Sequence, residues 1–194
     1  MRPQLLVRIL LVLAIGAALG VAASWAALRN GLAFDLVEAG PWVAAPRLAS
    51  RARDPYAAAA LARSGETPLD LAEALAFVAR ADASGAKLDG ACVYRVKGPA
   101  PQARFWTLTL TDQQGRLIEN DARRYGFTST EIVREETGGF EIAVSATARA
   151  GAWLPAPPDR RFALTLRLYD SPVAAAAATL QADALPQILR EQCR

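Results

Sequence analysis

The chain of 194 residues contains no histidine. Histidine is the usual base in Ser-His-Asp and Cys-His catalysis and the commonest protein ligand of zinc and copper. Its absence therefore argues against both kinds of catalytic centre and against most zinc and copper sites. A glycine-rich phosphate loop is also missing, since Gly138-Gly139 is typical of a turn and not of a nucleotide cradle. We predict neither a metal site nor a cofactor.

Charge is absent from the twenty consecutive residues Ile9 to Leu28. About twenty apolar residues are needed for a helix to cross the hydrocarbon core of a membrane. Arg2 and Arg8 precede this run, and short basic flanks stay in the cytoplasm. The sequence therefore predicts a membrane partner through residues 9–28, with the N-terminus cytoplasmic and the rest of the chain exported.

Two interpretations of this segment compete. It is an uncleaved signal anchor, or a secretory peptide cleaved at a small-residue site such as Val21-Ala22-Ala23 or Ser24-Trp25-Ala26. We favour the anchor, because the apolar run is longer than the roughly 7 to 15 residues of the apolar core of a secretory peptide. The sequence then divides into an anchor over residues 1–28, a connector over 29–53 and an exported domain over 54–194.

Basic residues show almost no excess once the anchor is set aside. Arg2 and Arg8 are two of 22 basic residues, which leaves 20 basic against 19 acidic side chains. A nucleic-acid partner requires a basic surface, so we predict none.

Only two cysteines are present, Cys92 and Cys193. In an exported domain an isolated pair is most simply a disulfide. Closing a loop of about 100 residues would contribute about 4 to 5 kcal/mol in the chain-entropy model. Two unpaired thiols remain the alternative, because a sequence does not establish proximity. A catalytic thiol is poorly supported without a histidine base.

The connector and the start of the domain carry helix and turn signals. Gly40-Pro41 interrupts the connector, where we expect extended chain, and Trp42 is expected at the membrane interface or, more commonly, at the edge of the core. Asp54-Pro55 is typical of an N-cap and first helical residue, which predicts a short helix to about Arg63. A second short helix is predicted from about Pro68, because leucine and valine recur at helical spacing in the residues that follow.

From Cys92 onward the pattern becomes β. Alternating apolar and polar residues predict several short strands separated by turns. They cover 92–97, 104–111, 116–118, 125–128, 131–134 and 140–146, with 131–146 expected as a hairpin. Many short strands after two helices favour a mainly β fold, an antiparallel β-sandwich, over alternating βαβ units.

The stretch from Gly151 to Pro172 is the most distinctive part of the sequence. Its prolines at 155, 157 and 158 predict a rigid, extended approach. Phe162 to Tyr169 then alternates, with the leucines on one face, as in a half-buried strand. Asp170-Ser171-Pro172 ends this strand.

These residues resemble a known family. Trp153-Leu154-Pro155, followed by Leu166-Arg167-Leu168-Tyr169 and Pro172, with Arg104-Phe105-Trp106-Thr107-Leu108 upstream, is similar to the bacterial family called domain of unknown function 1214. The similarity runs from about Gly90 to Ile188. Phe105-Trp106 stands where the family often has paired tryptophans, which keeps the aromatic bulk.

The resemblance extends to the helix at Asp54-Pro55-Tyr56 and to the strand at Cys92 to Tyr94, which look like the short, membrane-anchored form of the family. It implies a jelly-roll-like sandwich and an envelope location, here a bacterial inner membrane with the domain in the periplasm. It implies no reaction and no catalytic residues.

Trp153, Arg167, Tyr169 and Asp170 are the candidate binding residues. Such side chains recognise carboxylates, sugars or proteins over a large contact area. The alternative is structural, with Arg167 and Tyr169 paired across the outer face of a strand.

Carboxylate chemistry is the remaining enzymatic hypothesis. Asp82 with Asp89, or Glu135 with Glu136, would hydrolyse a glycoside if the fold held two acids about 5 to 9 Å apart. Loop acids are more commonly solvated and turn-forming, and the spacing of Asp82 and Asp89 does not match an EF-hand calcium loop. The sequence therefore favours a non-catalytic module that binds an envelope protein or glycan, with a histidine-free glycan hydrolase as the alternative.

Overall fold

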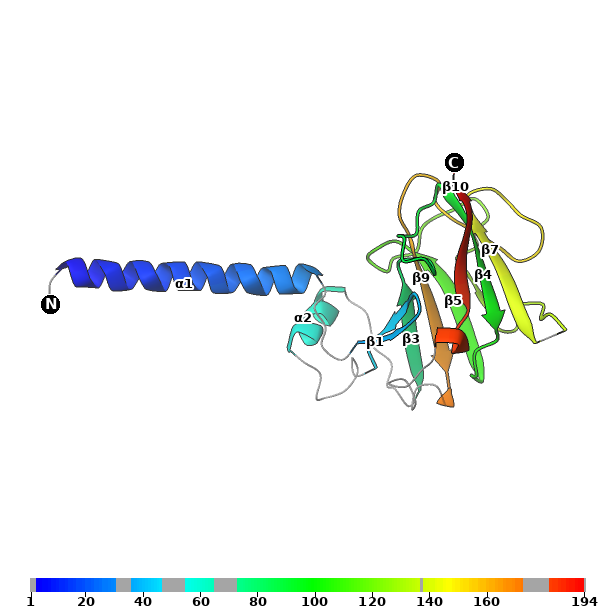
Figure 1. The fold of residues 1–194 in the computed structure, drawn as a ribbon, viewed down its shortest axis with the longest axis horizontal. Helices are drawn as coiled ribbons and strands as arrows, with labels where there is room; N and C mark the ends of the chain where they lie inside the picture. The colour runs from blue at the N-terminus through cyan, green and yellow to red at the C-terminus, as the bar shows by residue number, and fades with distance from the viewer. Residues whose placement is uncertain are drawn as a thin grey trace.

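The computed structural model describes residues 3–30, 36–46, 55–64, 73–136, 138–172 and 182–193. Within them, a long N-terminal helix precedes a sandwich of two β-sheets (Figure 1). The sandwich, the mainly β class and the mostly antiparallel pairing are as predicted from the sequence.

Helix α1 (Pro3–Asn30) is apolar along nearly its whole length. Its segment Gln4–Ala27 has 24 residues, a mean hydropathy of 2.6 and no burial against the rest of the chain. It is therefore long and apolar enough to cross a membrane. A secretory signal has similar properties, so the choice between an anchor and a cleaved peptide stays a prediction.

The larger sheet has six strands in the order β1-β2-β3-β9-β5-β6. Their bounds are β1 Val37–Ala39, β2 Trp42–Ala44, β3 Ala74–Ala79, β9 Ala163–Tyr169, β5 Phe105–Thr111 and β6 Gly126–Thr128. All neighbouring pairs in this sheet are antiparallel. The alternating stretch from 162 to 169 thus supplies a central strand, with partners on both sides.

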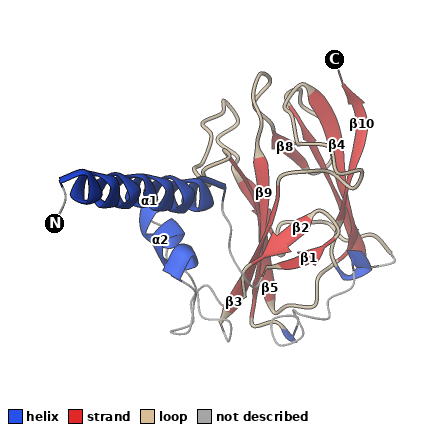
Figure 2. Ribbon diagram, turned by 60° about the vertical axis from the view of Figure 1, so that its left-hand side comes forward, coloured by secondary structure: helices blue, strands red, loops and turns tan. Residues whose placement is uncertain are grey.

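The smaller sheet has four strands in the order β10-β4-β7-β8. Their bounds are β10 Gln187–Cys193, β4 Cys92–Pro99, β7 Gly139–Ser145 and β8 Trp153–Pro155. The β7–β8 pair is parallel, and the other two pairs are antiparallel. Figure 2 shows the two sheets as separate layers, with β3, β9 and β5 in one and β4 and β10 in the other.

One apolar core lies between the sheets. It takes alternate residues of each strand, because successive side chains of a strand point to opposite faces. The Trp106 ring stacks on Phe140 with centroids 4.7 Å apart, which joins β5 of one sheet to β7 of the other. Tyr94 meets Phe162 edge to face across the same layer. The leucines of β9 are fully buried in this core, as their alternation predicted.

Residues 37–44 of the connector, expected as extended chain, form the β1–β2 hairpin. Gly40, with a φ of 60°, occupies the first position of the two-residue turn, where a positive φ requires glycine. Trp42 is fully buried, and its indole N–H donates to the Pro186 carbonyl at 2.7 Å. Of the two expectations for Trp42, the core edge is therefore confirmed.

One helix of the two predicted before the β region is present, and one prediction is wrong. Helix α2 (Pro55–Ser64) matches the first. The second was expected to continue from about Pro68 through Val78, but Ala74–Ala79 is strand β3, and residues 65–72 lie outside the described residues. The reason is that Leu75, Phe77 and Ala79 share one buried face at a period of two, and β2 and β9 provide the partners.

The predicted hairpin over 131–146 is also wrong. Residues 131–136 form no strand, and β7 pairs with β4 and β8 instead. Ile132 inserts into the core, while the Glu131 carboxylate accepts hydrogen bonds from the amide and hydroxyl of Thr128 at 2.8 Å each. These contacts hold the segment as a loop against the core, with Ile132 buried and Glu131 bonded to Thr128.

Candidate functional site

Strand β9 presents two of the sequence-predicted binding residues on the outer face of the six-stranded sheet. Arg167 lies between Ala76 of β3 and Thr107 of β5 in the register, and Tyr169 lies beside Phe105. The Tyr169 and Phe105 rings are 5.8 Å apart at an angle of 46°. Both rings and Arg167 are half-buried, so this end of the face combines aromatic area with one cation.

Asp170 directly follows Tyr169, the last residue of β9. Its φ of 46° lies in the left-handed region, which aspartate tolerates better than most residues. Its amide donates to the Glu73 carbonyl, and its own carbonyl accepts from the Arg104 amide. The carboxylate lies 3.9 Å from Arg104, and both side chains are exposed, so this ion pair contributes little. Asp170 thus has a structural role, because it shapes the turn that follows β9.

Trp153 does not join these three residues, because it lies on β8 of the other sheet. Its indole N–H donates to the Ser145 carbonyl at 3.0 Å, and its carbonyl accepts from the Arg124 guanidinium at 3.0 Å. The four predicted binding residues therefore divide into a group of three at the end of β9 and one residue elsewhere.

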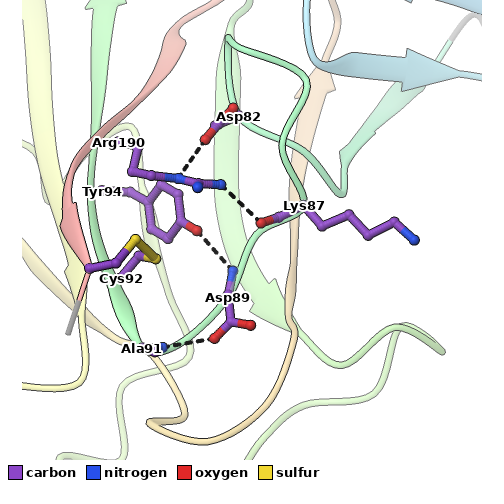
Figure 3. Close-up of a disulfide and its surroundings, with 8 residues drawn as sticks. Asp82, Lys87, Asp89, Ala91, Cys92, Tyr94 and Arg190 are labelled. Atoms are coloured by element: carbon purple, nitrogen blue, oxygen red, sulfur yellow. Dashed lines mark hydrogen bonds and ion pairs between the residues drawn. A yellow bond between two sulfur atoms is a disulfide. The ribbon is translucent and has the colours of Figure 1, made fainter.

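Asp82 is the most buried acid among the described residues, with 2% of its surface exposed. Oδ1 accepts hydrogen bonds from the amide of Ser84 at 2.9 Å, its hydroxyl at 2.6 Å, and the Ala86 amide at 3.1 Å. Oδ2 lies 2.8 Å from the Arg190 Nε (Figure 3). Within the described part of the chain Oδ2 has no well-aligned hydrogen bond, so this ion pair is what compensates its burial.

The ionisation of Asp82 reflects two opposing effects. Burial raises the pKa of the carboxyl, but the hydrogen bonds from Ser84 and Ala86, together with the Arg190 charge, outweigh it and hold the pKa of Asp82 below its ordinary value. A general acid needs the opposite shift. The environment of Asp82 therefore suits a structural group that is ionised at neutral pH.

Two other acids named in the hydrolase hypothesis, Asp89 and Glu135, also have structural partners. Asp89 accepts a hydrogen bond from the Ala91 amide at 3.0 Å, and its own amide donates to the Tyr94 hydroxyl at 2.9 Å (Figure 3). Glu135 lies 3.6 Å from Lys97. Glu136 is exposed in the loop after Ile132. In the portion of the chain that the structure describes, no three acids, cysteines or histidines form a potential metal site.

Cys92 and Cys193 form a disulfide, as predicted. The two residues are opposite each other in the β4–β10 register, so the bond joins the edge strand to its neighbour. Arg190, three residues earlier, lies over the Tyr94 ring at 5.6 Å and donates to the Lys87 carbonyl at 3.2 Å. The end of β10 is thus held by covalent, ionic and ring contacts together.

Sequence reasoning missed two features of these surfaces. The sequence presents Asp82 as a solvated loop acid or as half of a catalytic pair, since nothing local shows that it meets Arg190, 108 positions later in the chain. The outer face of the six-stranded sheet was also not recognised as a unit. Its alternating residues were visible within each strand, but the neighbours of each strand depend on pairing across the chain.

Comparisons with known proteins found one matching family and similar solved structures. A family model described as "Protein of unknown function (DUF1214)" matches residues 73–173. The crystal structure of the VPA0106 protein from Vibrio parahaemolyticus is similar over 92% of this chain, with a TM-score of 0.62 and 21% identity. A structure of an uncharacterised protein from Burkholderia cenocepacia matches 63% of this chain, with a TM-score of 0.44 and 23% identity.

This chain spans 44% of the length of the Vibrio protein and 30% of that of the Burkholderia protein. No curated protein matches the chain in sequence. At this level of identity the likeness to the Vibrio structure shows a shared fold only.

Proposed function

Because this chain belongs to the DUF1214 family of proteins of unknown function, we propose a function from its own surfaces: it is a non-catalytic, membrane-anchored binding module of the cell envelope. In this proposal α1 is an uncleaved anchor in a bacterial inner membrane, the N-terminus is cytoplasmic and the sandwich is periplasmic. The charge-free run, the basic residues before it and the disulfide support this arrangement.

The observation that carries the binding role is the outer face of β9. Arg167 and the Tyr169–Phe105 ring pair lie half-buried on a central strand, where neighbours on both sides fix the backbone. Arginine and tyrosine on a rigid support combine large contact area with low loss of conformational entropy on binding. This face therefore is the site at which we propose an envelope component binds, and Trp153 is left out of it.

The alternative, a carboxylate-dependent glycan hydrolase, has less support. The acids at 82, 89 and 135 are held by amide hydrogen bonds or cations, and the pKa of Asp82 is lowered and not raised. A direct test is release of soluble fragments from purified peptidoglycan by the full chain in detergent. We expect the original chain to release no more fragments than the Asp82→Asn variant does. If the original chain released fragments and either Asp82→Asn or Asp89→Asn abolished that release, the hydrolase would be established.

Location is tested with a reporter enzyme that is active only in the periplasm, fused after Arg194. We expect activity, and a matched fusion after Arg8 should be inactive because it lacks the apolar segment. Activity of a cytoplasmic reporter at Arg194 would overturn the topology.

Binding is tested by photo-crosslinking in intact cells. Benzoylphenylalanine in place of Tyr169 should give a discrete adduct of protein, glycan or lipid. The same residue in place of Val93, which is half-buried on the outer face of the other sheet, is the matched control. No adduct at Tyr169, or the same adduct at both positions, would contradict a binding site on β9.

A further inference from the structure

The two outer faces of the sandwich have different chemistry. On the four-stranded sheet, Arg95 lies 3.0 Å from Glu141 and also pairs with Glu191. Lys97 lies 3.6 Å from Glu141 on the same face. Alternating cations and anions of this kind are typical of a surface in contact with water.

The outer face of the six-stranded sheet carries mainly short, uncharged side chains. Its half-buried outward positions include Val43, Ala76, Val78, Thr107 and Thr109, while Thr165 at the centre of the face is buried. Arg167 is the only charged side chain that points outward from the fully described strands β2, β3, β9, β5 and β6, and Glu38 adds one acid on the edge strand β1. Its low charge, in contrast with the other face, makes it the candidate contact surface.

The aromatic residues of this face lie at the same end of β9 as Arg167. Tyr169 lies two positions along β9 from Arg167, and its ring is tilted against that of Phe105 on β5. Tyrosine rings and arginine side chains are characteristic of the membrane–water interface, where an apolar body and a polar end meet different surroundings. The face thus has the composition that suits lipid headgroups.

The connection to α1 limits how far the sandwich can lie from the membrane. Six residues separate Asn30, the end of α1, from Val37, the start of β1. Fully extended, they span about 20 to 25 Å. Strand β1 is the edge of the six-stranded sheet, so the connection reaches this sheet and not the charged one.

The arrangement of the helices agrees with this limit. In both views α1 and α2 lie on the side of β3, away from β10, and Figure 1 shows β1 on that side as well (Figures 1 and 2). The chain also enters β1 at Val37, from the side of the sheet where Ala74, Phe105 and Tyr169 pair.

We propose that the outer face of the six-stranded sheet rests on the lipid headgroups of the membrane that holds α1. The inference depends on the proposed function, because it requires α1 to be an anchor, and it names the lipid surface as the envelope component at β9. The aromatic rings and threonines supply the contact, and the single cation on this face makes it nearly independent of salt. The charged face of the four-stranded sheet points away from the bilayer.

The test uses the full chain in vesicles of phosphatidylethanolamine and phosphatidylglycerol that contain a lipid with a nitroxide on its headgroup. Two variants, Ala76→Cys and Ala143→Cys, receive a bimane fluorophore. Both positions are half-buried alanines that point outward, on β3 of the six-stranded sheet and on β7 of the four-stranded sheet. The native cysteines are joined in the disulfide, so the label reacts with the introduced thiol.

We expect bimane at position 76 to be quenched several-fold more strongly than at 143, with little change between low and high salt. Equal quenching at the two positions, or stronger quenching at 143, overturns the proposal. Vesicle flotation separates the two proposals. A chain that fails to float has no anchor, which rejects both, whereas a chain that floats with equal quenching rejects only the contact with lipid.

A second pair of variants tests whether side chains hold the face to the membrane. Phe105→Ser in the Ala76→Cys background removes one ring of the pair and should reduce quenching at 76 severalfold. Leu117→Ser is the matched control, since Leu117 is a 57% exposed apolar side chain in the loop after β5. Circular dichroism confirms folding, and Thr107→Glu, a charge on the same face, replaces Phe105→Ser if that variant unfolds. Unchanged quenching in a folded variant overturns the role of this face.

Discussion

The Nε of Arg190 lies 2.8 Å from Oδ2 of Asp82, so an ion pair joins the last strand of the smaller sheet to the turn that follows β3 of the larger one. The Asp82 side chain is 1% exposed and the Arg190 side chain 32% exposed. Asp82 is therefore desolvated, while its partner keeps contact with water. Removing the acid leaves the turn amides with a weaker acceptor, and it leaves Arg190 able to hydrate.

Asp82→Asn should lower the free energy of unfolding by about 1 to 2 kcal/mol. The amide keeps one acceptor oxygen for Ser84 and Ala86 but loses the ion pair and the charge-assisted hydrogen bonds. Denaturant unfolding followed by circular dichroism measures the change. Unaltered stability would show that the ion pair contributes nothing.

Asp112→Asn is the control, because the chain builds the same turn twice. Asp112 accepts hydrogen bonds from the Gln114 and Arg116 amides, as Asp82 does from residues at the same spacing. Gly115 and Gly85 each have a φ of 83°. Asp112 is more exposed, so its substitution should cost only about 0.5 kcal/mol.

The stability difference between the original chain and Asp82→Asn should depend on pH. The pKa of Asp82 is lower in the folded chain than the ordinary value of about 3.9 that applies when it is unfolded. Folding thus favours the ionised form, and its contribution is fully present above about pH 5 and is lost as the pH falls through the folded pKa. Unfolding measured from pH 7 to pH 3 should show the two chains converging. A constant difference would mean that ionisation of Asp82 does not contribute.

Removing the disulfide with Cys92→Ser and Cys193→Ser together should lower the free energy of unfolding by about 4 to 5 kcal/mol in the chain-entropy model, because the bond closes a separation of 101 residues. Thermal unfolding of the purified chain measures this. Without reductant the denatured original chain should yield no titratable thiol. Two thiols in that sample would contradict the bond.

Gly90→Ala should destabilise the sandwich strongly, by more than about 3 kcal/mol. A Cβ at this position would lie 1.4 Å from the Pro157 carbonyl oxygen, a backbone atom that cannot give way easily. Gly115→Ala meets no neighbour and is strained only by its positive φ, so it should cost about 1 kcal/mol. Equal melting temperatures for the two variants would reject the collision.

Leu166→Asp should prevent folding, since Leu166 is fully buried on central strand β9 and aspartate would bring an unpaired charge into the core. Thr107→Asp on the neighbouring strand points to the outer face and should leave the sandwich folded. Proteolysis and circular dichroism separate the two. A folded Leu166→Asp chain would show that this face of β9 tolerates charge.

Elements were predictable where the local pattern and the final environment agree. The leucine alternation of β9 identified its buried face, and the apolar run identified α1. Strand β3 was not predictable, because Leu71, Leu75 and Val78 match helical spacing, and only pairing with β2 and β9 makes Leu75, Phe77 and Ala79 one face. Such pairing joins distant segments and leaves no local signal.

The candidate site was predictable only in part for the same reason. Arg167, Tyr169 and Asp170 are neighbours in sequence, so their common position followed from one strand. Trp153 is also near in sequence but belongs to the other sheet, because the chain crosses between layers after Pro155. Phe105 could be assigned beside Tyr169 only from the β5–β9 register.

The position of β9 between β3 and β5 also sets the order of events during synthesis. The ribosome releases β3 and β5 long before β9, and β4 long before β10, so neither sheet can complete its pairing until the final part of the chain is made. Contacts of such long range make folding slow. At about 5 to 20 residues per second, strand edges with unpaired amides remain exposed for several seconds, and the nascent chain is at its most prone to aggregation then.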